Sequence, residues 1–246
     1  MIRLAYENDF PTICTHEAQV RICGLYLAYG LDTSFLQFYT DGEGRLLSIM
    51  DGVGIYYGDA MPDEWVTFLT MNPSIQTIHT SANLATELAN ANVWQIDREG
   101  VVMVYNGPDT DAPKDPRINT SPYLPDVYRL LEHHFPGISP LDYWYPDVSH
   151  RIRHGNCHIC VIQEGDMVVS SAMTVAETTT AAILGQIATH PDFRRMGLAQ
   201  TCIKSVISVC KDKLLYILPI NQYAQSMYEK MGFIPCDNWA ECSRSK

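Results

Sequence analysis

Residues 187–199 read Ile-Ala-Thr-His-Pro-Asp-Phe-Arg-Arg-Met-Gly-Leu-Ala and have the composition of an anion-binding turn between a strand and a helix. Amides in the first turn of a helix have no internal partner and lie at the positive end of the helix dipole, so they can hold a phosphate group. Gly197 and Ala199 keep bulk away from the backbone, while Arg194 and Arg195 add positive charge. A single glycine is a weak signal by itself, and an ordinary loop also fits it.

A resemblance strengthens the anion-site interpretation. Residues 191–199 resemble the acyl-CoA-binding motif of the GNAT acyltransferase superfamily, which has Arg or Gln, two residues, Gly, one residue, then Gly or Ala; Arg194, Gly197 and Ala199 fill it. Residues 221–233 are similar to a second family motif, with Asn, Ala, Tyr and Gly-Phe at the expected intervals. The resemblance implies a GNAT-like α/β (α+β mixed sheet) fold that takes acetyl-CoA (coenzyme A) as acyl donor.

The resemblance also implies roles for single residues. The loop amides would hold the pyrophosphate, and the preceding strand would pair with the pantetheine arm through its backbone. The residues implied to bind the cofactor are Ile187, Thr189, Arg194, Arg195, Met196, Gly197, Leu198, Ala199, Asn221 and Tyr228. Asn221 is also placed to cap a helix, which requires no contact with the cofactor.

The expected chemistry is attack of an amine on the thioester, after which the coenzyme leaves as a thiolate that needs a proton. Tyr228 matches the tyrosine that acts in many family members as the general acid, although a packing tyrosine beside the cofactor fits too. Many members carry a glutamate on the strand before the loop, but residues 182–188 contain no acid. Glu177 is the nearest candidate base, the alternatives being a solvated turn carboxylate and a water oriented by Gln186.

Substrate recognition in the superfamily usually involves the first two helices and the loops over the sheet. Here these carry Tyr143, Trp144, Tyr145 and Asp147, an aromatic wall with one acid that suits an amine. The same aromatic residues would equally suit an interface with the N-terminal half. The acceptor is therefore expected to be a small-molecule or peptide amine, and a homodimer stays open.

The elements that position these residues follow from periodicity and turn signals. Residues 107–117 contain three prolines and three aspartates, which predicts domains at 1–107 and 121–246 with a linker at 108–120. The second domain is predicted as two helices, three strands, a helix over 196–213, a strand, a helix over 222–231 and a final strand pair.

The first domain is predicted with hairpins pairing 35–39 with 45–57 and 93–96 with 101–105, helices over 63–71 and 82–90, and a strand over 75–80. This order suggests an internal duplication. The loop at 58–63 carries acids that would repel a pyrophosphate, so the N-terminal half is predicted to be a degenerate GNAT-like copy or accessory domain without cofactor.

Composition limits the alternatives. The net charge of −11 disfavours nucleic acid and anionic membranes as partners, and no apolar stretch approaches the 18 or so residues that cross a bilayer. The eight cysteines are expected to be reduced in a cytoplasmic protein, and Cys157 and Cys160, three apart on a strand, cannot chelate together, so no metal is expected. The predicted function is an acetyl-CoA-dependent N-acetyltransferase, with a non-catalytic acyl-CoA sensor or scaffold as the alternative.

Overall fold

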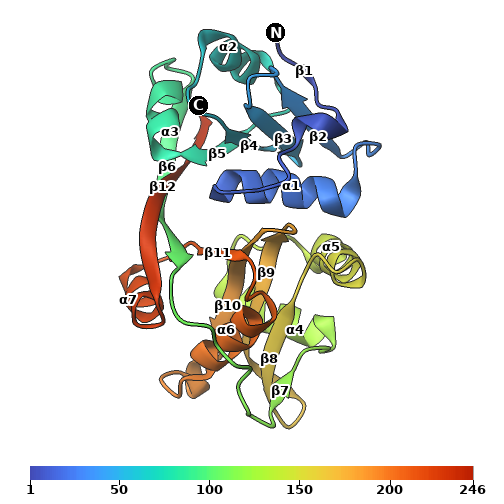
Figure 1. Ribbon diagram of the computed structural model, residues 1–246, viewed down its shortest axis with the longest axis vertical. Helices are drawn as coiled ribbons and strands as arrows, with labels where there is room; N and C mark the ends of the chain where they lie inside the picture. Colours follow the sequence, from blue (N-terminus) through green and yellow to red (C-terminus); the bar gives the residue numbers. More distant parts are fainter. Residues whose placement is uncertain (246) are drawn as a thin grey trace.

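A single mixed sheet of 12 strands runs through the protein in a computed structural model that describes residues 1–245 (Figure 1). The strand order is β1-β2-β3-β4-β5-β12-β6-β11-β10-β9-β8-β7. Two 3-10 turns, η1 (Glu7–Asp9) and η2 (Pro191–Phe193), complete the elements described below. The predicted mixed α/β fold is confirmed. No helix within residues 1–245 is long and apolar enough to span a membrane.

The C-terminal half is built from a meander followed by alternating helices and strands. Its elements are β7 (Ile118–Asn119), α4 (Leu124–His134), α5 (Leu141–Arg153), β8 (Ile159–Glu164), β9 (Met167–Glu177), β10 (Ala181–Thr189), α6 (Leu198–Val209), β11 (Leu214–Ile217), α7 (Gln222–Lys230) and β12 (Phe233–Arg244). The predicted final strand pair is wrong, because residues 233–244 form one long strand that bulges near Pro235 and Cys242.

From its meander onward, the N-terminal half repeats that order of elements. It contains β1 (Arg3–Leu4), α1 (Glu17–Tyr29), β2 (Leu36–Thr40), β3 (Leu46–Met50), β4 (Val53–Tyr57), α2 (Asp63–Met71), β5 (Thr77–Ser81), α3 (Ala82–Ala89) and β6 (Trp94–Tyr105). In both halves an antiparallel meander is followed by a helix, a parallel strand, a second helix and a long strand. The predicted duplication agrees with this topology.

The two halves exchange their last strands. Strand β6 of the N-terminal half pairs with β11, while β12 crosses back and pairs with β5, and the two long strands pair with each other over most of their length. Figure 1 shows β12 running from the lower half to the upper half, where the chain ends. The sheet is therefore continuous across the predicted linker at 108–120.

Strand β6 replaces the predicted hairpin over 93–105. The polar run at 97–100 looks like a turn, but Arg98 forms an ion pair with Glu241 on the neighbouring strand. Gly100 lies opposite Trp239, and a Cβ on it would be 2.8 Å from the indole Nε1. Gly100 therefore leaves room for the Trp239 indole. In the sequence, this glycine looks like a turn residue.

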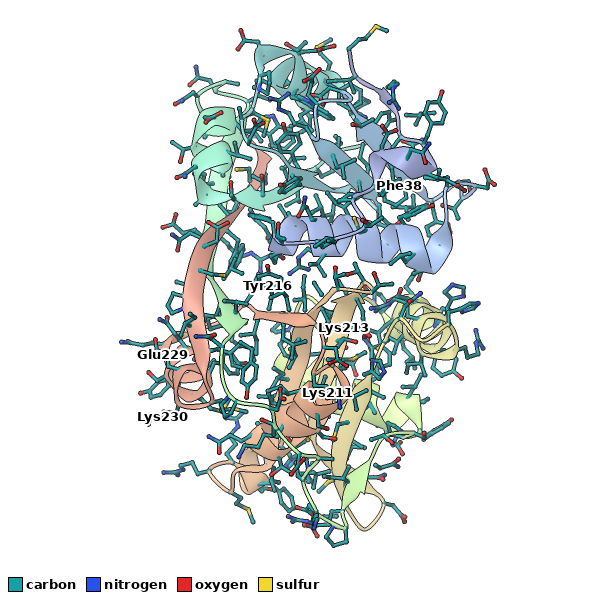
Figure 2. All side chains as sticks on the ribbon, viewed as in Figure 1. Phe38, Lys211, Lys213, Tyr216, Glu229 and Lys230 are labelled. Atoms are coloured by element: carbon teal, nitrogen blue, oxygen red, sulfur yellow. The ribbon has the colours of Figure 1, made fainter. Side chains whose placement is uncertain are left out.

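Helix α1 has no counterpart among the predicted elements and lies between the halves (Figure 1). It contacts β3, β4 and β5 on one side and β9 and β10 on the other, so it is buried on opposite faces and shows no single apolar stripe. Gly24 permits the close approach, because a Cβ there would be 3.1 Å from the Glu177 backbone nitrogen. Figure 2 shows Tyr216 in the same region, where its hydroxyl donates to the Thr15 carbonyl at 2.7 Å.

Candidate functional site

A groove opens at the start of α6, where β10 ends and the chain turns through η2. Gly197 is the N-cap of the helix with a φ of 78°, a left-handed conformation that favours glycine. The first bond of the helix runs from the Thr201 amide to the Gly197 carbonyl, which leaves the amides before it free for a ligand. A Cβ at position 197 would approach only Gln200 Oε1, at 4.0 Å, so the turn is open to solvent.

The groove has a volume of about 510 Å³ and collects most of the residues that the motifs indicated. The predicted cofactor residues that line it are Thr189, Arg194, Arg195, Gly197, Leu198, Ala199 and Asn221. Arg194 donates from Nε to the Thr189 carbonyl at 3.3 Å, which holds its guanidinium at the end of β10. Two arginines and a free helix start therefore surround a space large enough for a phosphate-bearing ligand.

The strands beside the groove diverge. Strands β10 and β11 pair in parallel over Ala181–Leu184 and Leu214–Ile217. Beyond Leu184, β10 pairs only with β9 within residues 1–245. A bulge between Gly185 and Ala188 includes Gln186, which has a φ of 48°. Within residues 1–245 no strand pairs with residues 185–189 on the β11 side, which is where the resemblance predicts that Ile187 and Thr189 meet the pantetheine arm.

The second motif forms α7 on the other wall. Asn221 caps this helix, since its Oδ1 accepts from the Ala224 amide at 2.9 Å, and it also lines the groove. Tyr228 is 6% exposed and belongs to the same buried cluster as Leu198 and Ile217. Burial raises the pKa of Tyr228 to about 12, so its hydroxyl keeps its proton at neutral pH. Of the residues predicted to bind the cofactor, Ile187, Met196 and Tyr228 do not line the groove.

Glu177 lies elsewhere, at the opposite end of β10 from the groove. Its Oε1 accepts from Lys213 Nζ at 2.7 Å, and its Oε2 lies 3.0 Å from His158 Nδ1 and 2.7 Å from the Thr174 hydroxyl. Burial alone would raise the pKa of Glu177, but these hydrogen bonds outweigh it and hold the pKa below its usual value. Glu177 thus has the contacts of a buried ion pair, and the structure does not bring it to Tyr228. Figure 2 labels its partner Lys213, which immediately precedes β11.

Cys210 joins His158 and Glu177 in a group whose ligand atoms lie within 4.8 Å of one another. Lys213 already occupies one carboxylate oxygen, and burial, with the nearby Glu177 charge, raises the pKa of the Cys210 thiol to about 12. Both features oppose metal binding, which needs a free carboxylate and a thiolate. Cys157 is a hydrogen-bond donor to the Thr174 carbonyl, so the CxxC spacing has a structural use.

A second cavity of about 780 Å³ lies between α5 and the N-terminal half. Tyr143, Trp144 and Asp147 line it as the aromatic wall predicted, while Tyr145 does not. Asp147 contacts the N-terminal half, because the Tyr29 hydroxyl of α1 donates to it. Sequence reasoning missed the residues that the N-terminal half contributes, since α1 was not foreseen and nothing in the sequence relates it to α5.

Comparison with known proteins bears on this geometry. The sequence model of the "Acetyltransferase (GNAT) family" matches residues 124–233, which hold the groove, β10, α6 and α7. No curated protein matches the chain.

Solved structures match at the level of the fold. A GCN5-related N-acetyltransferase from Sphaerobacter thermophilus is similar with a TM-score of 0.61 and 14% identity, covering 99% of this chain and 95% of its own. An acetyltransferase of the GNAT family from Novosphingobium aromaticivorans has a TM-score of 0.59 and 15% identity over 94% and 100% of the two chains.

A tandem GNAT protein from the clavulanic acid biosynthesis pathway has a TM-score of 0.59 and 11% identity over 92% of this chain and 87% of its own. The family match begins at residue 124, so the degenerate N-terminal copy stays a prediction. Residues 124–233 of this chain form a domain of the GNAT acetyltransferase family, whose members transfer an acyl group from coenzyme A to an acceptor.

Proposed function

We propose that the protein is an acetyl-CoA-dependent N-acetyltransferase that passes the acyl group directly to an amine. The observation that carries the proposal is the groove at Gly197. There the free amides at the start of α6 and two arginines lie beside the point where β10 and β11 cease to pair. Acetyl-CoA supplies the thioester whose acyl group is transferred. The α6 amides and Arg194 would bind its pyrophosphate, and the β10 backbone after Leu184 would hold the pantetheine arm.

Tyr228 is the proposed proton donor to the departing sulfur. When the amine nitrogen bonds to the acyl carbon, the carbon–sulfur bond breaks and the sulfur takes a proton, which Tyr228 recovers from solvent. A pKa of about 12, raised by burial, keeps the hydroxyl protonated and able to donate. The reacting nitrogen loses a proton in the same reaction, and a water oriented by Gln186 at the β10 bulge is the proposed recipient.

One observation favours the sensor as a second candidate. The carboxylate predicted as general base, Glu177, is engaged by Lys213 and His158, which leaves the amine without an obvious base. Release of free thiol from acetyl-CoA with a panel of amines tests the choice. Amine-dependent release supports the enzyme, whereas tight acetyl-CoA binding without release from any amine supports the sensor.

A further inference from the structure

The cavity between α5 and the N-terminal half and the cofactor groove both border on β10. Gln186 lines the cavity from the β10 bulge, and Thr189, three residues later on the same strand, lines the cofactor groove. Three residues of strand span about 10 Å, a distance that the arm between pyrophosphate and thioester can cover. Trp144 fixes Gln186 by donating from Nε1 to its Oε1 at 3.0 Å.

Three separate segments of the N-terminal half form one wall of this cavity. Tyr29 is the last residue of α1, Phe35 precedes β2, Met50 is the last residue of β3, and Asp51 follows it in the turn. The rings of Tyr29 and Phe35 meet edge to face with centroids 5.3 Å apart, and Tyr29 stacks on His150 of α5 at 5.0 Å. The wall is therefore aromatic and is fastened to the domain that holds the reaction centre.

The cavity also has a charge pattern. Asp147 is neutralised by Arg151, whose Nη2 lies 2.6 Å from its carboxylate. Asp51 and Asp142 remain, one from each half, and within residues 1–245 neither forms a salt bridge. Arg153 also lines the cavity, and its positive charge offsets one of these two carboxylates. One net negative charge therefore remains beside the aromatic rings. An ammonium group on an apolar body matches such a site.

We propose that the acceptor is a small primary amine with an aromatic or bulky apolar body, and that Phe35 and Asp51 of the N-terminal half determine this specificity. The inference rests on the proposed function, because it takes the cavity as the acceptor site of that reaction. A volume of about 780 Å³ fits a small molecule and is bounded on two sides, which suits such an amine better than a lysine within a protein. The N-terminal half is then part of the substrate site.

The test compares three ligands by ligand-observed NMR titration of the full chain. 2-Phenylethylamine combines charge and ring, ethanolamine keeps the charge without the ring, and 2-phenylethanol keeps the ring without the charge. We expect 2-phenylethylamine to bind about 5-fold or more tightly than either, which is the size of one exposed ion pair or cation–π contact. Equal binding of all three, or no binding of 2-phenylethylamine, would overturn the proposal.

Variants assign the effect to the wall. Asp51→Asn and Phe35→Ala are each expected to weaken 2-phenylethylamine about 5-fold and to raise its KM similarly with kcat little changed. Glu43→Gln, an exposed acid of the same half outside the cavity, is the matched control and should change neither. Variants that behave like Glu43→Gln, or a lysine peptide with a lower KM than 2-phenylethylamine, contradict the proposal.

The binding titration separates this inference from the proposed function. Failure of the proposed function shows as 2-phenylethylamine binding with no thiol released from acetyl-CoA by any amine. Failure of the inference shows as amine-dependent thiol release that Asp51→Asn and Phe35→Ala leave unchanged.

Discussion

Gly197→Glu, measured against Gly197→Ala, tests the cofactor groove. The φ of 78° at this position makes any side chain cost about 1–2 kcal/mol in backbone strain, and both variants bear that cost equally. A Cβ would meet only Gln200 Oε1 at 4.0 Å, so neither variant clashes with the fold. The pair therefore differs in bulk and charge at an exposed turn.

The magnitude follows from Coulomb's law. A glutamate carboxylate here would lie about 4 Å from a pyrophosphate, and each pair of unit charges at that distance repels by about 1 kcal/mol in water and about 4 kcal/mol near a protein surface. With about two ligand charges the lower bound is about 2 kcal/mol, which corresponds to an approximately 30-fold loss of affinity for acetyl-CoA.

Calorimetric titration with acetyl-CoA gives both affinities, and urea unfolding checks that the two variants are equally stable. One site per chain is expected for the wild type, since the loop at residues 58–63 carries acids where the loop before α6 carries Arg194 and Arg195. Equal affinity of the glutamate and alanine variants would refute the assignment of the loop. Two equivalent sites would refute the degenerate N-terminal half.

Four further outcomes are expected. Tyr228→Phe should lower kcat at least about 100-fold where chemistry limits the rate, with the affinity for acetyl-CoA nearly unchanged; normal turnover in a rapid-quench assay would reduce Tyr228 to packing. Glu177→Gln should cost about 3–5 kcal/mol in urea unfolding at neutral pH, because Lys213 loses its buried partner, yet alter kcat only a few-fold; a 100-fold loss of kcat would make Glu177 the base after all. Because its folded pKa is depressed, the stability that Glu177 contributes is complete above its usual pKa of 4.5 and should decline as pH falls below that value, and an unchanged acid limb in the variant would contradict this. A chain of residues 121–246 alone should fail to fold by circular dichroism, since it lacks β6, the partner of both β11 and β12; a cooperative transition would contradict that.

The C-terminal site was predictable because its signals are local. The motif around Gly197 and the helix cap at Asn221 each lie within a few residues of sequence, and each has one physical purpose. The amphipathic helix α6 has one face on the sheet, so its period is visible in the apolar pattern. These features do not depend on what the rest of the chain does.

The connections between the halves were not predictable in the same way. Helix α1 is buried on two sides, so its sequence shows no amphipathic period. In β6, the polar run that ends at Gly100 looks like a turn in the sequence, although these residues pair with β12. Which strand pairs with β11 is decided by residues more than a hundred positions apart, as with Tyr216 and Val104. The wall of the acceptor cavity could not be predicted for the same reason, because only the tertiary fold brings Phe35 and Asp51 into one cavity with Gln186.

The central claim is transfer of the acyl group to an amine, and a mass balance tests it most directly. The protein is incubated with acetyl-CoA and the amine panel, and mass spectrometry counts N-acetylated amine against free coenzyme A. We expect one acetylated amine for each thiol released, with both reduced in Gly197→Glu at acetyl-CoA concentrations below those that saturate the wild type. Thiol without acetylated amine would indicate hydrolysis, and acetyl-CoA binding with neither product would contradict the enzyme and leave a binding protein.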